Sequence, residues 1–172
     1  MAEPEMTVRN LDPELKARLL SIYEEVMWLS RRPNVSASCA RAWYTHIMAN
    51  TVTRRVRRFS GMVSKAALAS DGTDLMLEHY LRIQTTLTAM VERHKNLKRP
   101  SANEFLNLMI KYERVHIVTR SENYAALRSK GDYEEAGIRL LDWGKLPKAR
   151  RVTLWQRMLR GRVANALEFL PE

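Results

Sequence analysis

Residues 115–143 read VHIVTRSENYAALRSKGDYEEAGIRLLDW, and this stretch decides the fold class. Residues 115–119 are mostly β-branched, which is typical of a buried strand. Thr119 and Glu122 form a capping box at the start of a short helix that Gly131 would close. Residues 138–142 read as a second strand, and the order strand, helix, strand favours a parallel pair joined by a right-handed crossover. The chain is therefore predicted to be α+β and mainly α-helical, with a small two-stranded β element at about 115–119 and 138–142.

The remainder of the chain has helical periodicity, so we expect five to six helices in all. Asp12 is a predicted N-cap with Pro13 at the first helical position, and this helix would run to about residue 32. Apolar residues at helical spacing predict a second helix that continues through residue 63. Further helices are predicted at 74–96, at 102–113 and from 147 into the carboxy-terminal segment.

The size and composition of the chain favour one packed domain over residues 1–172, with residues 1–5 as a flexible N-terminal tail. The single cysteine, Cys39, excludes an intramolecular disulfide and a thiolate metal cluster within one chain. No stretch is long and apolar enough to span a membrane, and the acidic start does not resemble a secretory signal. We therefore expect a cytoplasmic protein without a membrane partner, and the interpretation that we favour includes no bound metal and no other cofactor.

Positive charge is concentrated in particular segments of this chain. The net charge is +10, and the excess lies in residues 51–70, 95–121 and 148–172. Residues 50–66, NTVTRRVRRFSGMVSKA, contain no acidic residue. A helix with a buried Val/Phe stripe would hold the arginines of this segment together on its exposed side. Because arginine binds phosphate in bidentate geometry and releases counterions from nucleic acid, we expect a nucleic-acid-binding protein, and favour DNA.

The expected role is regulatory or accessory and non-catalytic. The carboxy-terminal segment repeats the arrangement of arginines around an apolar stripe. The residues predicted to bind nucleic acid are Arg54, Arg55, Arg57, Arg58, Lys65, Lys148, Arg150, Arg151, Arg157, Arg160 and Arg162. Two alternatives stay open: a solvated cationic surface without a partner, and a protein-interaction partner, such as an antitoxin or assembly factor, that meets an acidic protein.

Carboxylates beside imidazoles provide a second hypothesis, a metal-dependent nuclease. Glu78 and His79 are adjacent, and Glu113 precedes His116 by three residues. An imidazole can bind a divalent cation or take a proton while a carboxylate orients water. The candidates for this site are Glu78, His79 and His116. His94 lies on an apolar helical stripe, and we expect it to be packed and hydrogen bonded.

If residues 73–78 formed a strand, LMLEH (75–79) followed by a helix would resemble the HNH nucleases, in which a histidine ends a strand ahead of the helix. The resemblance implies that His79 belongs to the active site. The sequence departs from the family pattern, since no Asn and His follow at the usual places, and residues 74–96 read better as one helix.

Two further short resemblances concern nucleic-acid proteins. RAWYTH (41–46) has the arginine–histidine spacing of the HEPN ribonucleases, which implies that Arg41 stabilises phosphate charge and that His46 is the acid or base. MTVRNLDPELKARL (6–19) resembles the start of ribbon-helix-helix DNA-binding proteins, which implies an N-terminal strand with Thr7 and Arg9 facing the major groove. The first helix is longer than that family requires.

The tryptophans are expected in the core rather than as platforms for stacked bases, because they lie on apolar stripes or at strand ends. They are Trp28, Trp43, Trp143 and Trp155.

Overall fold

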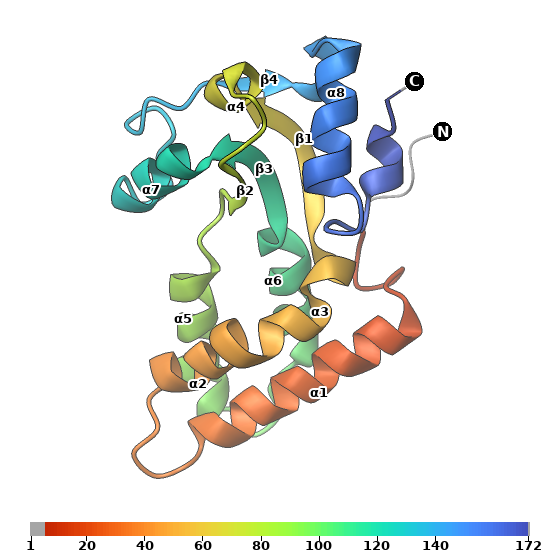
Figure 1. Ribbon diagram of the computed structural model, residues 1–172. Coiled ribbons are helices and arrows are strands. Elements are labelled where there is room, and N and C mark those ends of the chain that lie inside the picture. The colour runs from red at the N-terminus through yellow and green to blue at the C-terminus, as the bar shows by residue number, and fades with distance from the viewer. Residues whose placement is uncertain (1–5, 172) are drawn as a thin grey trace. The chain divides into compact units, whose positions relative to one another are not determined.

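The computed structural model describes residues 6–171, so the expected tail over residues 1–5 lies outside the described residues. The contacts within the chain divide it into two compact units (Figure 1). The helical unit comprises the described residues as far as Val56 together with Ile83–Tyr112, and the sheet unit comprises Arg57–Arg82 and the chain from Glu113 onward. The predicted α+β class with mainly helical content is confirmed, whereas one domain over residues 1–172 stays a prediction.

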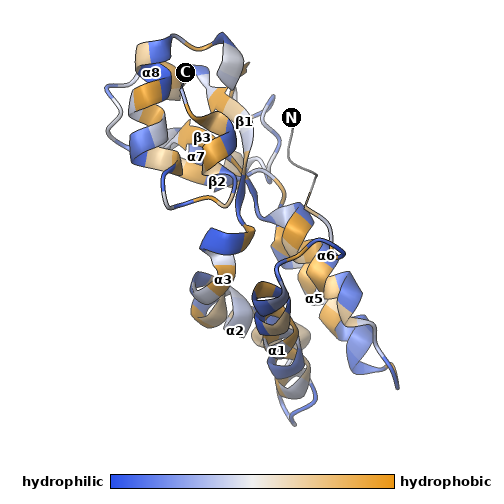
Figure 2. Cartoon of the chain, turned by 90° about the vertical axis from the view of Figure 1, so that its right-hand side faces the viewer, coloured by the Kyte–Doolittle hydropathy of each residue, from blue (hydrophilic) through white to orange (hydrophobic). Residues whose placement is uncertain are grey.

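Each helix of the helical unit contributes buried apolar residues to one core. Apolar and polar residues are interspersed along these helices (Figure 2). Asp12 caps the first helix as predicted, accepting a hydrogen bond from the backbone N–H of Leu15 at 2.9 Å. The apolar stripe of this helix packs with the fully buried Phe105. The elements of the unit are α1 (Pro13–Ser30), α2 (Ala37–Trp43), the π-helical turn η1 (Tyr44–Met48), α3 (Ala49–Val56), α5 (Ile83–Lys95) and α6 (Ala102–Tyr112).

The predicted helix through residue 63 is wrong beyond Val56, where α3 ends and strand β1 (Arg58–Ser64) begins. Phe59 and Val63 are four residues apart, and this spacing suits one face of a strand as well as one face of a helix. Both side chains are buried in the core of the sheet unit, and Gly61 takes a φ of +82° at an irregularity of the strand. Helical periodicity therefore misled the prediction here, because the same spacing satisfies both structures.

The predicted helix over residues 74–96 is wrong in its first part. Leu75–His79 form strand β2, and α5 begins only at Ile83. Leu75 and Leu77 pack against the core of the sheet unit, as the alternation of a strand requires. Pairing with a neighbouring strand has overridden the helical pattern of the segment.

The sheet has four strands in the order β2-β3-β1-β4. Strands β3 (Arg114–Thr119) and β4 (Leu140–Asp142) confirm the two predicted strand positions. They do not pair with each other, because β1 lies between them and runs parallel to β3 and antiparallel to β4. On its other side β3 pairs antiparallel with β2. The predicted two-stranded parallel element is therefore replaced by a four-stranded mixed sheet.

Different helices cover the two faces of the sheet (Figure 1). On the face that we call the α8 face, side chains of β1, β2 and β3 pack with α8 (Lys148–Leu154) and the π-helical turn η3 (Trp155–Leu159). On the α7 face, Ser64 at the end of β1 donates a hydrogen bond of 2.5 Å to Glu122 of α7 (Arg120–Arg128). The remaining elements are α4 (Lys65–Ala69) and the 3-10 turns η2 (Trp143–Lys145) and η4 (Ala166–Phe169).

The helix predicted from residue 147 into the carboxy-terminal segment is interrupted after Leu159. Gly161 takes a φ of +68° there, and a short 3-10 turn follows further on. Among residues 6–171, no helix combines the length and the apolar character needed to cross a membrane.

A chain of hydrogen bonds joins three helices of the helical unit. The Oη atom of Tyr23 lies 2.8 Å from Nδ1 of His94, and Nε2 of His94 lies 2.8 Å from Oε2 of Glu104. Burial raises the pKa of Tyr23, so its hydroxyl stays protonated and donates to Nδ1. Hydrogen bonds from Arg93 and His94 hold the pKa of Glu104 below its ordinary value, which favours the carboxylate that accepts from Nε2. His94 is packed and hydrogen bonded as expected.

Replacing Tyr23 by phenylalanine should lower the free energy of unfolding by roughly 1–3 kcal/mol, because Nδ1 of the buried His94 would lose its donor. Urea unfolding measures this difference. The matched control is Tyr124→Phe, since Tyr124 is exposed and its change should leave stability nearly unaltered. A Tyr23→Phe variant as stable as the parent would show that this hydroxyl contributes nothing.

Candidate functional site

The register of β2 and β3 arranges the predicted site residues. Glu78 lies opposite His116, and His79 lies opposite Val115. Successive side chains of a strand point to opposite faces, so Glu78 and His116 share one face whereas His79 lies on the other. Leu77 and Val115 contact the core under α8, which places His79 on the α8 face and the Glu78–His116 pair on the α7 face.

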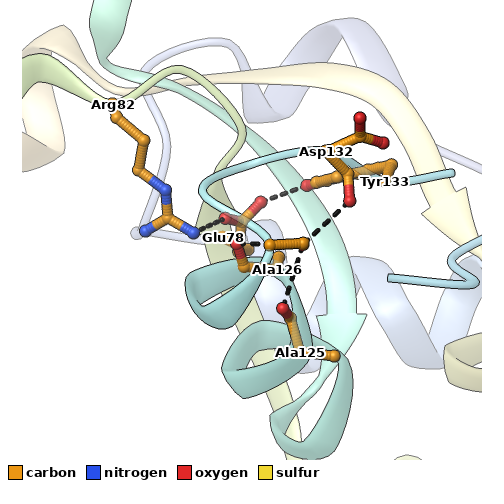
Figure 3. Close-up of polar contacts among 7 residues, drawn as sticks. Glu78, Arg82, Ala125, Ala126, Asp132 and Tyr133 are labelled. Atoms are coloured by element: carbon orange, nitrogen blue, oxygen red, sulfur yellow. Dashed lines mark hydrogen bonds and ion pairs between the residues drawn. The ribbon is translucent and has the colours of Figure 1, made fainter. Parts of the chain in front are cut away.

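Glu78 is enclosed on the α7 face, with only 1% of the residue exposed. The hydroxyl of Tyr133 donates a hydrogen bond to one carboxylate oxygen, and Arg82 lies 3.2 Å from the other (Figure 3). Burial, together with the same hydrogen bond, raises the pKa of Tyr133 far above its ordinary value, so the phenol remains a donor. Both oxygens of Glu78 are thus already bonded within the protein.

The loop that carries Tyr133 is hydrogen bonded to the end of α7. Ser129 donates hydrogen bonds to backbone carbonyls of Ala125 and Asp132 at 3.1 and 2.9 Å (Figure 3). Gly131 takes a φ of +93°, and a side chain there would lie 3.4 Å from the carbonyl oxygen of Tyr80. The positive φ favours glycine at this position, two residues before Tyr133, whose hydroxyl bonds Glu78.

His116 is packed between aromatic rings. Its Nδ1 lies 2.5 Å from Oγ of Ser60, Tyr80 stacks on its ring at 4.3 Å, and Tyr133 meets it edge-on at 5.5 Å. Burial lowers the pKa of His116 to about 4, so the imidazole is neutral at neutral pH. The ring of His116 is thus enclosed, and its Nδ1 is already bonded within the protein.

His79 is different, because 35% of its side chain is exposed. Its Nε2 lies 2.9 Å from Oε2 of Glu113, a carboxylate that is only 10% exposed. The Nε of Arg57 lies 3.6 Å from the same oxygen. The accessible imidazole of His79 is therefore oriented by the buried carboxylate of Glu113, which also contacts Arg57.

The imidazoles and carboxylates do not form one cluster, because strand alternation divides them between the two faces. Within residues 6–171, no three His, Cys, Asp or Glu side chains are grouped so that they could hold a metal ion. The metal centre that an HNH resemblance would require is not matched by these donors. The local form of that resemblance is present all the same, since β2 ends at His79 ahead of α5.

The arginines of residues 54–58 do not lie together on one helix, because the chain changes from α3 to β1 among them. Arg55 binds Asp12 at 2.5 Å and Glu14 at 3.2 Å in the helical unit. In the sheet unit Arg58 forms an ion pair with Glu168, and Arg57 lies beside Glu113. Arg54 is exposed on α3. Most of the charge in this segment is thus used within the protein.

The carboxy-terminal cations divide into structural and accessible ones. Arg150 donates to the backbone carbonyl oxygens of Leu68 at 2.7 Å and of Ala67 and Ser70, where α4 ends. Arginine side chains can satisfy such carbonyls at the end of a helix, so Arg150 has a structural role. Arg151 is half-buried. The exposed members of the predicted set in the sheet unit are Lys65, Lys148, Arg157, Arg160 and Arg162.

The residues of the other two resemblances lie in the helical unit. Arg41 lines a hollow of about 630 Å³ between α2 and α5, but exposed His46 in η1 is not part of its lining. Residues 6–12 form turns, with Thr7 bonded to Asn10, so the N-terminal strand that would carry Thr7 and Arg9 is absent from the described residues.

Sequence reasoning missed Ser60, Tyr80 and Tyr133 as neighbours of the site. Only the sheet order brings Ser60 to His116, because β1 was taken for a helix. The adjacency of Glu113 to His79 could have been found from an antiparallel pairing of 75–79 with 115–119, since that register places Glu113 beyond the end of β2.

Comparisons of this chain with models of known protein families, with curated proteins and with solved structures find no match. Function is therefore inferred from the geometry of the sites alone.

Acid should destabilise the fold through His116. The unfolded chain takes up a proton near the ordinary pKa of about 6.5, whereas folded His116 does so only near 4. The unfolded state therefore binds more protons in this window, and stability falls as pH drops from about 6.5 towards 4, by about 3 kcal/mol at most. Urea unfolding at a series of pH values should show that the free energy of unfolding falls less steeply between about pH 6.5 and 4 in His116→Gln than in the parent. The exposed His46, changed to Gln, is the control, and an equally steep fall in His116→Gln would contradict the assignment.

Proposed function

We propose that this chain binds nucleic acid on the α8 face of its sheet unit and hydrolyses a phosphodiester bond there with His79 as general base. The observation that carries the proposal is the His79–Glu113 pair, a part-exposed imidazole 2.9 Å from a buried carboxylate. A histidine oriented by a carboxylate is well suited to taking a proton from water. The pairing distinguishes His79 from His116, which is enclosed, and from His46, which has no such orienting carboxylate among the described residues.

The chemistry follows from the two nitrogens of His79. Because an ionised carboxylate only accepts hydrogen bonds, Nε2 carries the proton donated to Glu113, and Nδ1 keeps its lone pair. Nδ1 can then accept a proton from a water molecule that attacks phosphorus, while Glu113 stabilises the imidazolium that forms. The P–O bond to the leaving alkoxide breaks, the imidazolium or solvent water gives that oxygen a proton, and His79 returns to its neutral form. Arg57 lies beside Glu113 and compensates the negative charge of this carboxylate, which keeps it ionised as the acceptor for His79. No step is assigned to a metal ion, because the donors here form only a pair.

Cations on the same side of the sheet support binding to a polyanion. η3 contacts β2 and packs on the face that carries His79. Arg157 belongs to η3, and Arg160 and Arg162 follow it, all three exposed. Clustered exposed arginines attract phosphate by charge and by counterion release. A substrate held by these residues would lie along the face where His79 is accessible.

A cleavage assay tests whether the protein hydrolyses a phosphodiester bond with His79 as general base. The substrates are labelled single- and double-stranded DNA and RNA, in buffers with Mg²⁺ and with a chelator. His79→Ala should lower the cleavage rate by roughly 10²-fold or more, because general-base catalysis contributes about that much. His46→Ala, an exposed histidine of the helical unit, is the control and should cleave like the parent. Cleavage that persists in His79→Ala would contradict the assignment of the base.

Binding titrations across salt concentrations test the electrostatic part. Changing both Arg157 and Arg160 to glutamine should weaken binding to every sequence alike and reduce the salt slope by roughly 2 on duplex DNA. Arg128→Gln is the matched control, because Arg128 is exposed on α7, on the other side of the sheet. Affinity that does not change with salt would count against nucleic acid as the partner. Salt-dependent binding without cleavage by the parent would replace hydrolysis by a non-catalytic accessory role.

A further inference from the structure

A hollow in the helical unit has the chemistry of a ligand site and takes no part in the proposed hydrolysis. It has a volume of about 340 Å³ and lies between the end of α1 and the connection from α5 to α6. This volume lies within the range of small-molecule sites in proteins, about 300–1,000 Å³. The side chains that matter for its chemistry are Tyr23, Met27, Trp28, Arg31, Lys98 and Pro100.

The apolar part of the hollow includes an exposed aromatic ring. Trp28 was expected in the core, as was Trp43, but 58% of Trp28 and 41% of Trp43 are exposed. Trp28 lies on α1, next to the buried Met27. The guanidinium of Arg32 lies over its ring, 4.5 Å from the centroid. This contact restrains the indole, so a planar ligand would meet a ring whose position is already set. The rings of Tyr23 and Pro100 extend the apolar surface.

The polar part of the hollow is cationic. Arg31 and Lys98 are exposed, and neither side chain forms a hydrogen bond or an ion pair with another residue in the range 6–171. Glu24 is the one acidic residue in the lining, so the charge of the hollow is positive. The charge of Arg31 acts on the hydroxyl of Tyr23, lowering the pKa that burial raises, which places this guanidinium near the inner wall. Two unpaired cations beside an aromatic surface suit a ligand that is both planar and anionic.

We propose that this hollow binds a nucleoside phosphate, with the base stacked against Trp28 and the phosphate held by Arg31 and Lys98. Stacking on an aromatic side chain accepts any base, because every base has a π-face, and arginine and lysine bind the phosphate by charge. Such a group occurs as a free nucleotide and as one unit of a single strand. Both sources present the same chemistry to the hollow.

Calorimetric titration tests the proposal with two probes, adenosine monophosphate and a short single-stranded oligodeoxyadenylate. Trp28→Ala should weaken binding of the recognised probe on the order of tenfold, because stacking of one base contributes about that much. The control is Trp43→Ala, since Trp43 is an exposed tryptophan of the same unit outside the hollow. Arg31→Gln should also weaken binding and should reduce its dependence on salt.

The outcomes separate the sources and can overturn the proposal. Trp28-dependent binding of the mononucleotide identifies a free nucleotide as ligand, and Trp28-dependent binding of the oligonucleotide alone identifies a unit of a single strand. Absence of saturable binding of both probes by the parent would overturn the proposal. Equal binding by Trp28→Ala and the parent would overturn it as well, because the probe would then occupy another surface, such as the α8 face. Neither result depends on whether His79 cleaves a phosphodiester.

Discussion

Pairing of β3 between β1 and β2 is the constraint on which the sheet unit depends. β3 has neighbours on both sides, and its residues from Val115 to Thr119 are buried. A strand in this position satisfies its backbone hydrogen bonds only if both neighbouring segments are extended. Residues 58–64 and 75–79 are therefore strands, although their apolar spacing also suits helices. The position of every candidate side chain in this unit follows from that pairing.

Strand alternation then separates two sets of groups that look equivalent in the sequence. Glu78 and His79 are neighbours in the chain, yet they lie on opposite faces of the sheet. Glu78 is enclosed by Tyr133 and Arg82, so its charge is compensated within the protein. His79 is accessible and paired with Glu113. A shift of the register by one residue would exchange these two environments, which is why the chemistry of the site depends on the pairing rather than on the residue types.

The arginines illustrate how a high net charge can be divided between stability and recognition. Arg55, Arg58 and Arg150 are bound to carboxylates or backbone carbonyls of their own unit. A guanidinium with five donors in a fixed plane is suited to such contacts. An arginine that is bound in this way contributes less positive charge to the surface that a partner would contact. The charge left for a polyanion is therefore smaller than the net value of +10 indicates, and it lies in other segments than the richest run of arginines.

Local sequence signals determined what depends on neighbours along the chain. The N-cap at Asp12 and the capping box of Thr119 and Glu122 follow from residues within a few positions of one another. So do the helix predicted at 102–113 and the strand positions predicted at about 115–119 and 138–142, which the structure places at 102–112, 114–119 and 140–142. The α+β class and the packed role of His94 were equally predictable. Tertiary structure alone decided that 58–64 and 75–79 are strands, that Glu113 orients His79, that Trp28 is exposed, and which arginines are paired. The physical reason is that apolar residues four positions apart can share one face of a helix or one face of a strand. Only hydrogen bonds and contacts between distant segments make one of these two structures lower in free energy.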